Sequence, residues 1–199
     1  MPNDCFRTIA APSEGFFSEK RSRFLSFAIP VASAEEAMEH VDALRKKFYD
    51  ARHVCWAYML GPDGSVYRSN DDGEPSSTAG KPILGRIKSS ELTDVLIVVV
   101  RYFGGIELGT SGLIVAYRNA AADAIANAQI EERTVDDTFG IVFEYPQQNV
   151  VMRILKEEKP AVISRNFQTD CRITLRIRKS LAPRLRQRLA SVDNLKFES

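Results

Sequence analysis

Cysteine, histidine and tryptophan are scarce in this chain of 199 residues, which has three cysteines, two histidines and one tryptophan. Cys5, Cys55 and Cys171 are odd in number and far apart, which fits reduced thiols in the cytoplasm better than a disulfide framework. With only two histidines, a site built from several histidines is excluded, and the spacing of a calcium loop is absent. We therefore expect no metal and no other cofactor.

Long apolar runs are also missing. No run of about 18 apolar residues occurs, so we expect neither a membrane-spanning helix nor a membrane partner. Residues 1–15 lack a basic start followed by an apolar core, so we do not expect a signal peptide. The apolar fraction of 44% and the charged fraction of 27% are ordinary for a soluble globular protein. The composition predicts a cytoplasmic protein of one large domain or two small ones.

Acidic residues are absent from one stretch, Cys171 to Val192, which carries seven basic residues. Residues 1–130 hold 14 Lys and Arg against 16 Asp and Glu, a net charge of −2. Residues 131–199 hold 13 against 10, a net charge of +3. Any attraction to polyanions is therefore expected from the C-terminal part.

Apolar periodicity predicts mixed strands and helices before residue 130. Ser33 and Glu36 form a capping box, S-x-x-E, which predicts a helix start. The unbroken apolar run from Val95 to Val100 predicts a strand that is buried on both faces. The expected strands are 6–11, 16–29 with a turn or bulge within 19–23, 53–60, 65–69 and 94–103. One helix is expected to begin at Ser33, and two others are expected to cover 83–88 and 111–129.

The polar segment EERTVDD, Glu131–Asp137, is predicted to be a linker between domains at 1–133 and 134–199. Beyond it the pattern indicates the order βαββαβ, which is the ferredoxin-like plan. Ser180 is the expected N-cap of the last helix. The expected strands there are 139–145, 161–168, 171–179 and 195–197, with helices at 147–159 and 181–192.

Two polar loops flank the apolar strand, and loops on a rigid scaffold often carry a site. The first loop, DDGEPSSTAGKP, offers the carboxylates of Asp71, Asp72 and Glu74, and Lys81 at its exit. These carboxylates could bind a divalent cation, act as a base, or hold Arg and Lys side chains. The alternative is an acidic turn whose side chains cap local backbone N–H groups.

The second loop, GGIELGTSG, runs from Gly104 to Gly112 and opens a helix. Its glycines and the helix start could bind a phosphate or a carboxylate. It matches neither a Walker A loop nor a Rossmann fingerprint, and the alternative is a tight strand-to-helix turn. Arg101, just before this loop, could contact an anionic ligand or pair with a carboxylate of the first loop.

His53 and Cys55 lie on one face of their predicted strand. Such neighbours are about 7 Å apart, too far for a nucleophilic pair without help. We expect Cys55 in the core and His53 in a structural or rim position. No catalytic residue is predicted from these positions.

The predicted strand CRITLRIRK places Arg172, Thr174, Arg176 and Arg178 on one face. This basic face could meet RNA phosphates, and the predicted RNA-facing patch includes Arg184 and Arg188 of the following helix. The aromatic residues that would stack on bases are missing from the strand. The alternative is a solvated face.

Three segments within residues 16–130 resemble the conserved core of the IMPACT/YigZ family: ARHVCWAYML, SNDDGEPSSTAGKPIL and VVVRYFGGIELGTSGLIVAYRNAA. The resemblance implies an α+β protein with a ribosomal-protein-S5-domain-2-like N-terminal domain and a ferredoxin-like C-terminal domain, as in bacterial YigZ-type members. Eukaryotic members modulate translation by competing for the activator of a starvation-responsive kinase. The resemblance therefore implies a translation-linked protein with a cleft built by the two loops.

The residues expected in this ligand or partner cleft are His53, Asp71, Asp72, Gly73, Glu74, Thr78, Lys81, Arg101, Tyr102, Gly104, Gly105, Gly109, Thr110, Gly112 and Tyr117. The sequence departs from the family at Glu107, where a basic residue is common, at Ser77 and Ser111, where Gly is common, and near Val115, where Arg is common. The lost cations weaken the case for polyanion binding by this cleft.

The sequence is compatible with three functions. The first is a non-enzymatic cytoplasmic protein that binds the ribosome, RNA or a translation-associated protein. The second is a small-molecule phosphate-binding enzyme related to the S5-like kinases, in which Asp71 or Asp72 is the base or a magnesium ligand. The third is a pure protein-interaction module in which the carboxylates and Arg101 form a structural network.

Overall fold

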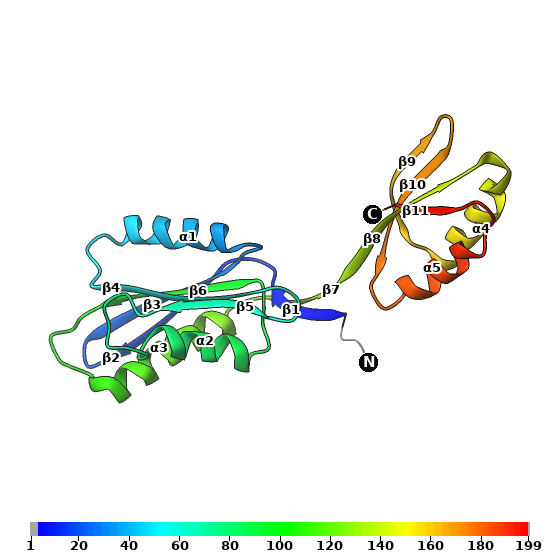
Figure 1. Cartoon of the computed structure of the whole chain (residues 1–199). Coiled ribbons are helices and arrows are strands. Elements are labelled where there is room, and N and C mark those ends of the chain that lie inside the picture. The colour runs from blue at the N-terminus through cyan, green and yellow to red at the C-terminus, as the bar shows by residue number, and fades with distance from the viewer. Residues whose placement is uncertain (1–3, 199) are drawn as a thin grey trace. The chain divides into compact units, whose positions relative to one another are not determined.

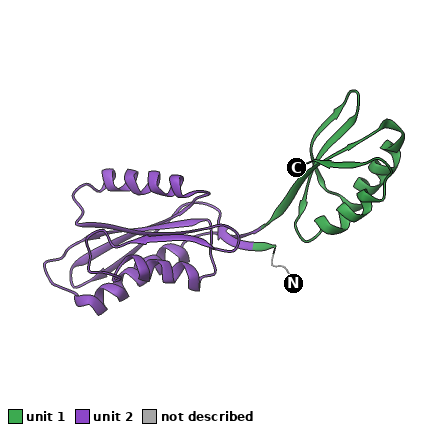
Figure 2. Cartoon of the chain, in the orientation of Figure 1, with its two compact units in different colours: residues 1–5, 134–199 green, residues 6–133 purple. Residues whose placement is uncertain are grey.

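The computed structural model describes residues 4–198, which divide into two compact units (Figure 2). Phe6–Arg133 forms the first, called the N-terminal unit here. The second, the C-terminal unit, takes in the described residues up to Cys5 and resumes at Thr134. Both units contain helices and antiparallel sheets, so the protein has a mixed α+β architecture.

The N-terminal unit has a five-stranded antiparallel sheet in the order β2-β3-β6-β4-β5, with α1 on one face and α2 and α3 on the other (Figure 1). On central strand β6, Val99 faces α2 and α3 whereas Val100 faces α1, and both are fully buried. The predicted burial of this strand on both faces is confirmed. The elements are β1 Cys5–Ile9, β2 Ser13–Glu19, β3 Ser22–Pro30, α1 Ala34–Lys47, β4 His53–Leu60, β5 Val66–Asn70, α2 Gly80–Ser89, β6 Val95–Tyr102, α3 Gly109–Ala126 and β7 Ile130–Thr134.

Two predictions from local sequence near the N-terminus, a turn and a helix start, are confirmed. Lys20 and Arg21 have φ of 44° and 66° and join β2 to β3 in the turn that was expected within 19–23. The Ser33 hydroxyl accepts a hydrogen bond from the Glu36 amide at 3.2 Å, which caps α1. The Glu36 carboxylate reaches back to the Ala32 amide at 2.7 Å, one residue before the N-cap.

The boundary between the two units falls inside the predicted linker Glu131–Asp137, but this segment forms strands rather than irregular chain. β7 covers Ile130–Thr134 and pairs with β1 in a two-stranded sheet, and β8 begins at Asp136. Most residues of β7 are exposed, so this ribbon needs no apolar face of its own. The polar composition of this segment therefore does not distinguish a strand from a linker, because the strand with which it pairs lies at the other end of the sequence.

The C-terminal unit has the predicted order βαββαβ, and its sheet has the strand order β11-β8-β10-β9. Ile173 and Leu175 of β10 pack against α4 and α5, whereas Arg172 and Arg176 lie on the opposite, open face. The elements are β8 Asp136–Phe143, the 3₁₀ turn η1 Tyr145–Gln147, α4 Gln148–Glu158, β9 Ala161–Phe167, β10 Cys171–Arg178, α5 Ala182–Ala190 and β11 Lys196–Glu198.

Ser180 does not cap α5, contrary to prediction. The N-cap is Leu181, and the Ser180 amide donates instead to the Asp4 carboxylate at 3.0 Å. Arg178 donates two further hydrogen bonds to the same carboxylate, at 2.7 and 2.8 Å. These donors hold the pKa of Asp4 far below its usual value, with the Arg178 hydrogen bond as the largest cause.

Candidate functional site

Asp71 holds the first loop together from within. Its carboxylate accepts hydrogen bonds from three backbone amides, those of Ser77 at 2.8 Å, Ala79 at 3.0 Å and Gly80 at 2.8 Å. These contacts close the loop onto the first turn of α2, which has no side-chain bond from its own N-cap, Ala79. The interpretation as a turn that caps local N–H groups therefore holds for Asp71.

Asp72 turns outward and ties the loop to α1. Its carboxylate receives a two-pronged contact from the guanidinium of Arg45, at 2.9 and 3.1 Å, and a hydrogen bond from the Val54 amide at 2.6 Å. Asp72 has a φ of 42° and Gly73 a φ of 82°, so the backbone reverses sharply here. Both predicted carboxylates are thus engaged by groups of the protein itself.

Glu74 is the buried centre of the site. One oxygen of its carboxylate accepts hydrogen bonds from Nη1 of Arg101 at 2.6 Å and from the hydroxyl of Tyr117 at 2.7 Å. The side chains of Glu74 and Arg101 are only 3% and 7% exposed. Of the three carboxylates considered for Arg101, the structure selects Glu74, and the pair joins the first loop to the end of β6.

Cys55 and Tyr117 lie behind this ion pair, between the sheet and α3. The Cys55 sulfur is 3.0 Å from the Asp71 carbonyl oxygen and 3.3 Å from the Tyr117 hydroxyl. Burial raises the pKa of the Cys55 thiol and that of the Tyr117 hydroxyl. Cys55 is therefore a core thiol, as predicted, and Tyr117 is a protonated donor to Glu74.

His53 stands at the rim of the site, as expected. Its Nδ1 atom is 2.7 Å from the Asp72 carbonyl oxygen, and its Nε2 atom is 3.8 Å from the second oxygen of Glu74. The pairing of β4 with β6 sets His53 opposite Arg101. Strand register thus brings the histidine, the arginine and the loop carboxylate to one point.

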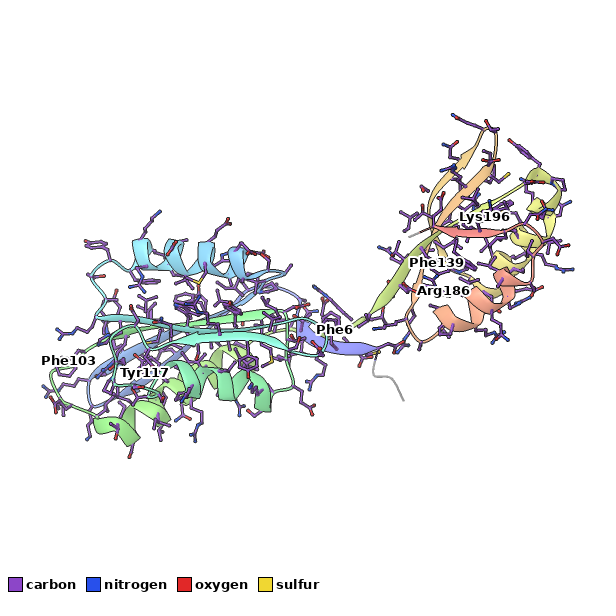
Figure 3. The ribbon with its side chains drawn as sticks, viewed as in Figure 1. Phe6, Phe103, Tyr117, Phe139, Arg186 and Lys196 are labelled. Carbon is purple, nitrogen blue, oxygen red and sulfur yellow. The ribbon has the colours of Figure 1, made fainter. Side chains whose placement is uncertain are left out.

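These groups form one wall of a cavity of about 410 Å³. Phe103, labelled in Figure 3 on the loop after β6, also lines it. Polar and apolar residues line the cavity together: Arg52, His53, Glu74, Pro75, Arg101, Phe103, Glu107, Leu108, Gly109, Thr110 and Leu113. The Nε atom of Arg101 is buried and has no hydrogen-bond partner within the described chain. The cavity can therefore receive a group that has both an apolar part and a polar end.

The second glycine loop is mainly a tight turn. A Cβ atom at Gly104 would lie 2.1 Å from the backbone of Arg21, so this glycine permits a close approach of two chain segments. Gly105 and Gly109 have φ of 83° and 69°. A Cβ at Gly112 would lie 3.1 Å from Leu108. Of this loop, Gly109 and Thr110 reach the cavity.

The predicted cleft residues do not share one surface. His53, Glu74, Arg101, Gly109 and Thr110 line the cavity. Thr78 is buried and donates to the Pro75 carbonyl at 2.6 Å, and Tyr102 donates to Asp50 at 2.9 Å. Lys81 lines a separate hollow.

Sequence reasoning missed Arg52 and Leu113 as lining residues. Both lie within segments that resemble the family, Arg52 beside His53 and Leu113 after Gly112, but neither was predicted to line the cleft. The fold places both at the cavity, Leu113 from the second turn of α3. Their roles follow from strand register and helix position, which a single sequence does not show.

The predicted basic patch is not one surface. Arg172 and Arg176 project from the open face of the sheet, whereas Arg184 and Arg188 belong to α5, which covers the other face. Each arginine of the patch contacts a carboxylate: Arg172 with Glu198, Arg176 with Asp136, Arg178 with Asp4, Arg184 with Glu158, and Arg188 with Glu157 and Glu158. These ion pairs neutralise the positive charge on which the prediction of an RNA-facing patch rested.

Comparison with known proteins places the chain in a family. A family model described as the Impact N-terminal domain matches residues 20–125. An IMPACT family member of Haemophilus influenzae is 34% identical over 160 residues, 79% of this chain and 78% of that protein. The chain belongs to the IMPACT family.

Other relatives extend this result. IMPACT family member YigZ of Escherichia coli is 35% identical over 161 residues, 80% of this chain and 79% of that protein. A Protein IMPACT homolog of Saccharomyces cerevisiae is 35% identical over 114 residues, 55% of this chain and 43% of that protein. A solved structure described as that of a hypothetical protein is 30% identical, covers 98% of this chain and 97% of its own, and has a TM-score of 0.73.

Two features are absent from residues 4–198. None of the helices there is both long and apolar enough to cross a membrane. Within the same residues, no three His, Cys, Asp or Glu side chains gather as a set that could hold a metal ion.

Proposed function

We propose that this protein is a non-enzymatic cytoplasmic binding protein linked to the regulation of translation, and that its cavity receives a group of a ribosome-associated or translation-associated partner. Membership in the IMPACT family supports the link to translation. The observation that carries the site is the cavity of about 410 Å³ over the buried Glu74–Arg101 pair.

The charges around the cavity favour a protein partner there. Glu74 neutralises Arg101 at 2.6 Å, so the cavity is not a strong site for an isolated phosphate. Phe103, Leu108 and Leu113 add apolar walls. A side chain with an apolar body and a polar tip fits this lining, and such groups anchor protein interfaces.

The enzyme alternative requires a free carboxylate beside the glycine loop. Asp71 instead accepts three backbone amides, and Asp72 is held by Arg45. This engagement argues against either residue as a base or magnesium ligand. A thermal shift assay with ATP and magnesium tests the alternative, since a ligand at 100 times its dissociation constant adds about 2.7 kcal/mol. We expect no shift at millimolar ATP.

The cavity itself is tested by filling it. Thr110 is exposed at its edge, so Thr110→Trp should block the cavity without touching the Glu74–Arg101 pair. Ser111→Trp, at the exposed next position, is the matched control because Ser111 does not line the cavity. We expect Thr110→Trp to lose co-sedimentation with ribosomal particles at low salt while Ser111→Trp keeps it. Equal co-sedimentation of both variants and wild type would refute a role for the cavity.

We also propose finer fold assignments for the two units. The N-terminal domain, 1–133, is taken as S5-domain-2-like, as the family resemblance implies. The C-terminal domain, 134–199, is taken as ferredoxin-like, and its βαββαβ order and the sheet order β11-β8-β10-β9 support this assignment.

A further inference from the structure

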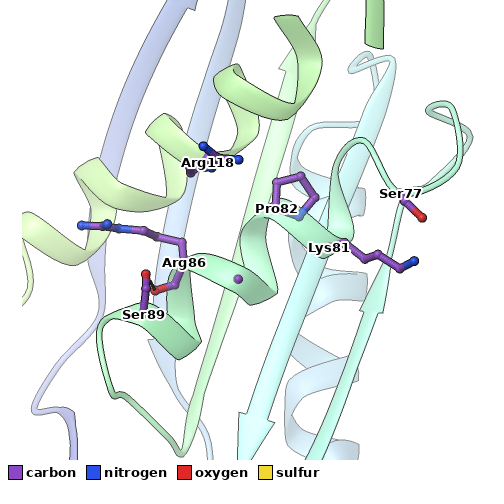
Figure 4. A pocket seen from close by; sticks show the side chains of 7 residues that line it. Ser77, Lys81, Pro82, Arg86, Ser89 and Arg118 are labelled. Carbon is purple, nitrogen blue, oxygen red and sulfur yellow. Dashed lines mark hydrogen bonds between the residues drawn. The ribbon is translucent and has the colours of Figure 1, made fainter. Parts of the chain in front are cut away.

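A second hollow of the N-terminal unit, called the α2–α3 groove here, has a volume of about 500 Å³ (Figure 4). It is distinct from the cavity over Arg101, with which it shares no lining residue. Its lining comes from α2, from Arg118 of α3 and from the loop before α2: Ser77, Lys81, Pro82, Gly85, Arg86, Ser89 and Arg118. The groove thus presents three cations and two hydroxyl groups, and no carboxylate lines it.

The three cations of the α2–α3 groove have no partners within the described chain. Lys81, Arg86 and Arg118 form no ion pair with any of residues 4–198. The Nε atom of Arg86 is also buried without a hydrogen-bond partner there. Cations gathered in one hollow repel each other. The binding of an anion among them therefore lowers the electrostatic energy of the protein.

The cations are spread along the groove. Lys81, Gly85 and Ser89 follow each other at intervals of four residues on one face of α2, and Arg86 stands beside them. Five residues of helix separate the two cations of α2, Lys81 and Arg86, a rise of about 7.5 Å, and Arg118 adds a third cation from α3. A single phosphate group cannot span this length, whereas a chain of phosphates can.

Gly85 leaves the floor of the groove open. It lies within α2, where glycine costs about 1 kcal/mol relative to alanine. A Cβ atom at Gly85 would meet nothing within 4 Å among residues 4–198 outside its own helix backbone and chain neighbours, so packing does not require a glycine. The missing side chain instead lets an external ligand approach the helix backbone.

We propose that the α2–α3 groove binds the phosphate backbone of a nucleic acid and does not read its sequence. The lining includes three cations and the hydroxyl group of Ser77, and none of its residues is aromatic, which suits phosphate contacts rather than base stacking. RNA is the expected nucleic acid, a choice that rests on the proposed link to translation. Phosphate binding by the groove does not depend on what the cavity holds.

The test is the salt dependence of binding to a labelled 12-nucleotide uridine RNA, followed by fluorescence anisotropy with the full-length protein. Three phosphate contacts to a single strand should give a slope of log K against log salt of about −2. Arg86→Gln/Arg118→Gln should reduce that slope to about −0.7 and weaken binding at low salt roughly tenfold or more. The matched control, Arg172→Gln/Arg176→Gln, removes two paired arginines of the C-terminal unit and should behave like wild type.

Two more variants separate the possible outcomes. Gly85→Ala keeps every charge, and it should weaken RNA binding severalfold while it raises the melting temperature. Thr110→Trp should bind RNA like wild type, so failure of the cavity proposal and failure of the groove proposal are seen separately. An unchanged slope in the groove double variant, or an equal loss in the control, overturns the groove proposal. Complete displacement of RNA by millimolar inorganic phosphate overturns it too, because it would indicate a site for one phosphate.

Discussion

Arginine has opposite roles in the two units of this protein. In the C-terminal unit, Arg178 is held by Asp4 and Arg188 by Glu157 and Glu158. In the α2–α3 groove, Arg86 and Arg118 have no carboxylate partner within residues 4–198. The unit with the larger net positive charge therefore has its clustered arginines neutralised, and the unit with a net negative charge has cations that are available to a ligand. Local pairing, rather than net charge, decides where a polyanion can bind.

Arg101 is a third case, because its charge is both buried and paired. Removal of one partner from such a pair leaves an uncompensated charge in the protein interior. Glu74→Ala should therefore destabilise the N-terminal unit by about 3–5 kcal/mol, the largest effect expected for any single change here. Urea denaturation measures it. Glu107→Ala, at an exposed wall of the same cavity, should stay within about 0.5 kcal/mol of wild type, and equal small effects would contradict a buried ion pair.

The ion pair of Arg178 should make the stability of the C-terminal unit depend on pH. The pKa of Asp4 is lowered in the folded protein, so its stabilising effect is present above the ordinary aspartate pKa of about 3.9 and is lost as the pH falls. Asp4→Asn should lower the melting temperature at pH 7, and the difference from wild type should shrink toward pH 3. Asp193→Asn, at an exposed position, is the control and should show no such difference. A constant gap between Asp4→Asn and wild type over this range would contradict the assignment.

The groove can be examined through stability alone. Gly85→Ala should stabilise the N-terminal unit by up to about 1 kcal/mol, because alanine favours the helix and the added Cβ meets nothing. Gly80→Ala in the same helix should destabilise it, since a Cβ there would lie 2.7 Å from the backbone of Asn70. Thermal unfolding of both variants measures the contrast. Destabilisation by Gly85→Ala would mean that the protein itself fills the groove.

The smallest effects are expected from Arg172 and Arg86. Arg172→Gln breaks a pair with Glu198 that is about half exposed on both sides, and it should cost no more than about 0.5 kcal/mol. Arg86→Gln should also stay within about 0.5 kcal/mol, because it breaks no ion pair. Denaturation curves that show a larger loss for Arg86→Gln would indicate a structural role in place of a binding role.

Much of the fold follows from local patterns. The run Val95–Val100 predicted a strand buried on both faces, and Ser33 with Glu36 predicted the start of α1. β7 was missed because it pairs with β1, more than a hundred residues away, and has no buried face of its own. Pairing between distant polar strands leaves no periodic signal in the sequence.

The site was only partly predictable for a similar reason. The composition of the first loop indicated a site. Its three carboxylates have different partners, however, and only the fold shows that Glu74 pairs with Arg101. The basic segment Cys171–Val192 contains no acidic residue, yet its neutralising partners arrive from other elements, among them Asp4 and Glu158. Lys81 was predicted as a cleft residue, but the α2–α3 groove was not predicted, because Lys81 and Arg118 are distant in sequence and line one hollow only in the folded chain.

We propose that this IMPACT family protein meets the translation apparatus through the cations of its α2–α3 groove in addition to its cavity, and not through its arginine-rich C-terminal segment. Sucrose-gradient sedimentation of cell lysates at low and high salt tests it most directly, with wild type, Arg86→Gln/Arg118→Gln and Arg172→Gln/Arg176→Gln. Wild type and the C-terminal variant should co-sediment with ribosomal particles at low salt and be released at high salt, while the groove variant stays at the top of the gradient. Co-sedimentation of the groove variant, or loss of the C-terminal variant or of wild type from the particles at low salt, would contradict the claim.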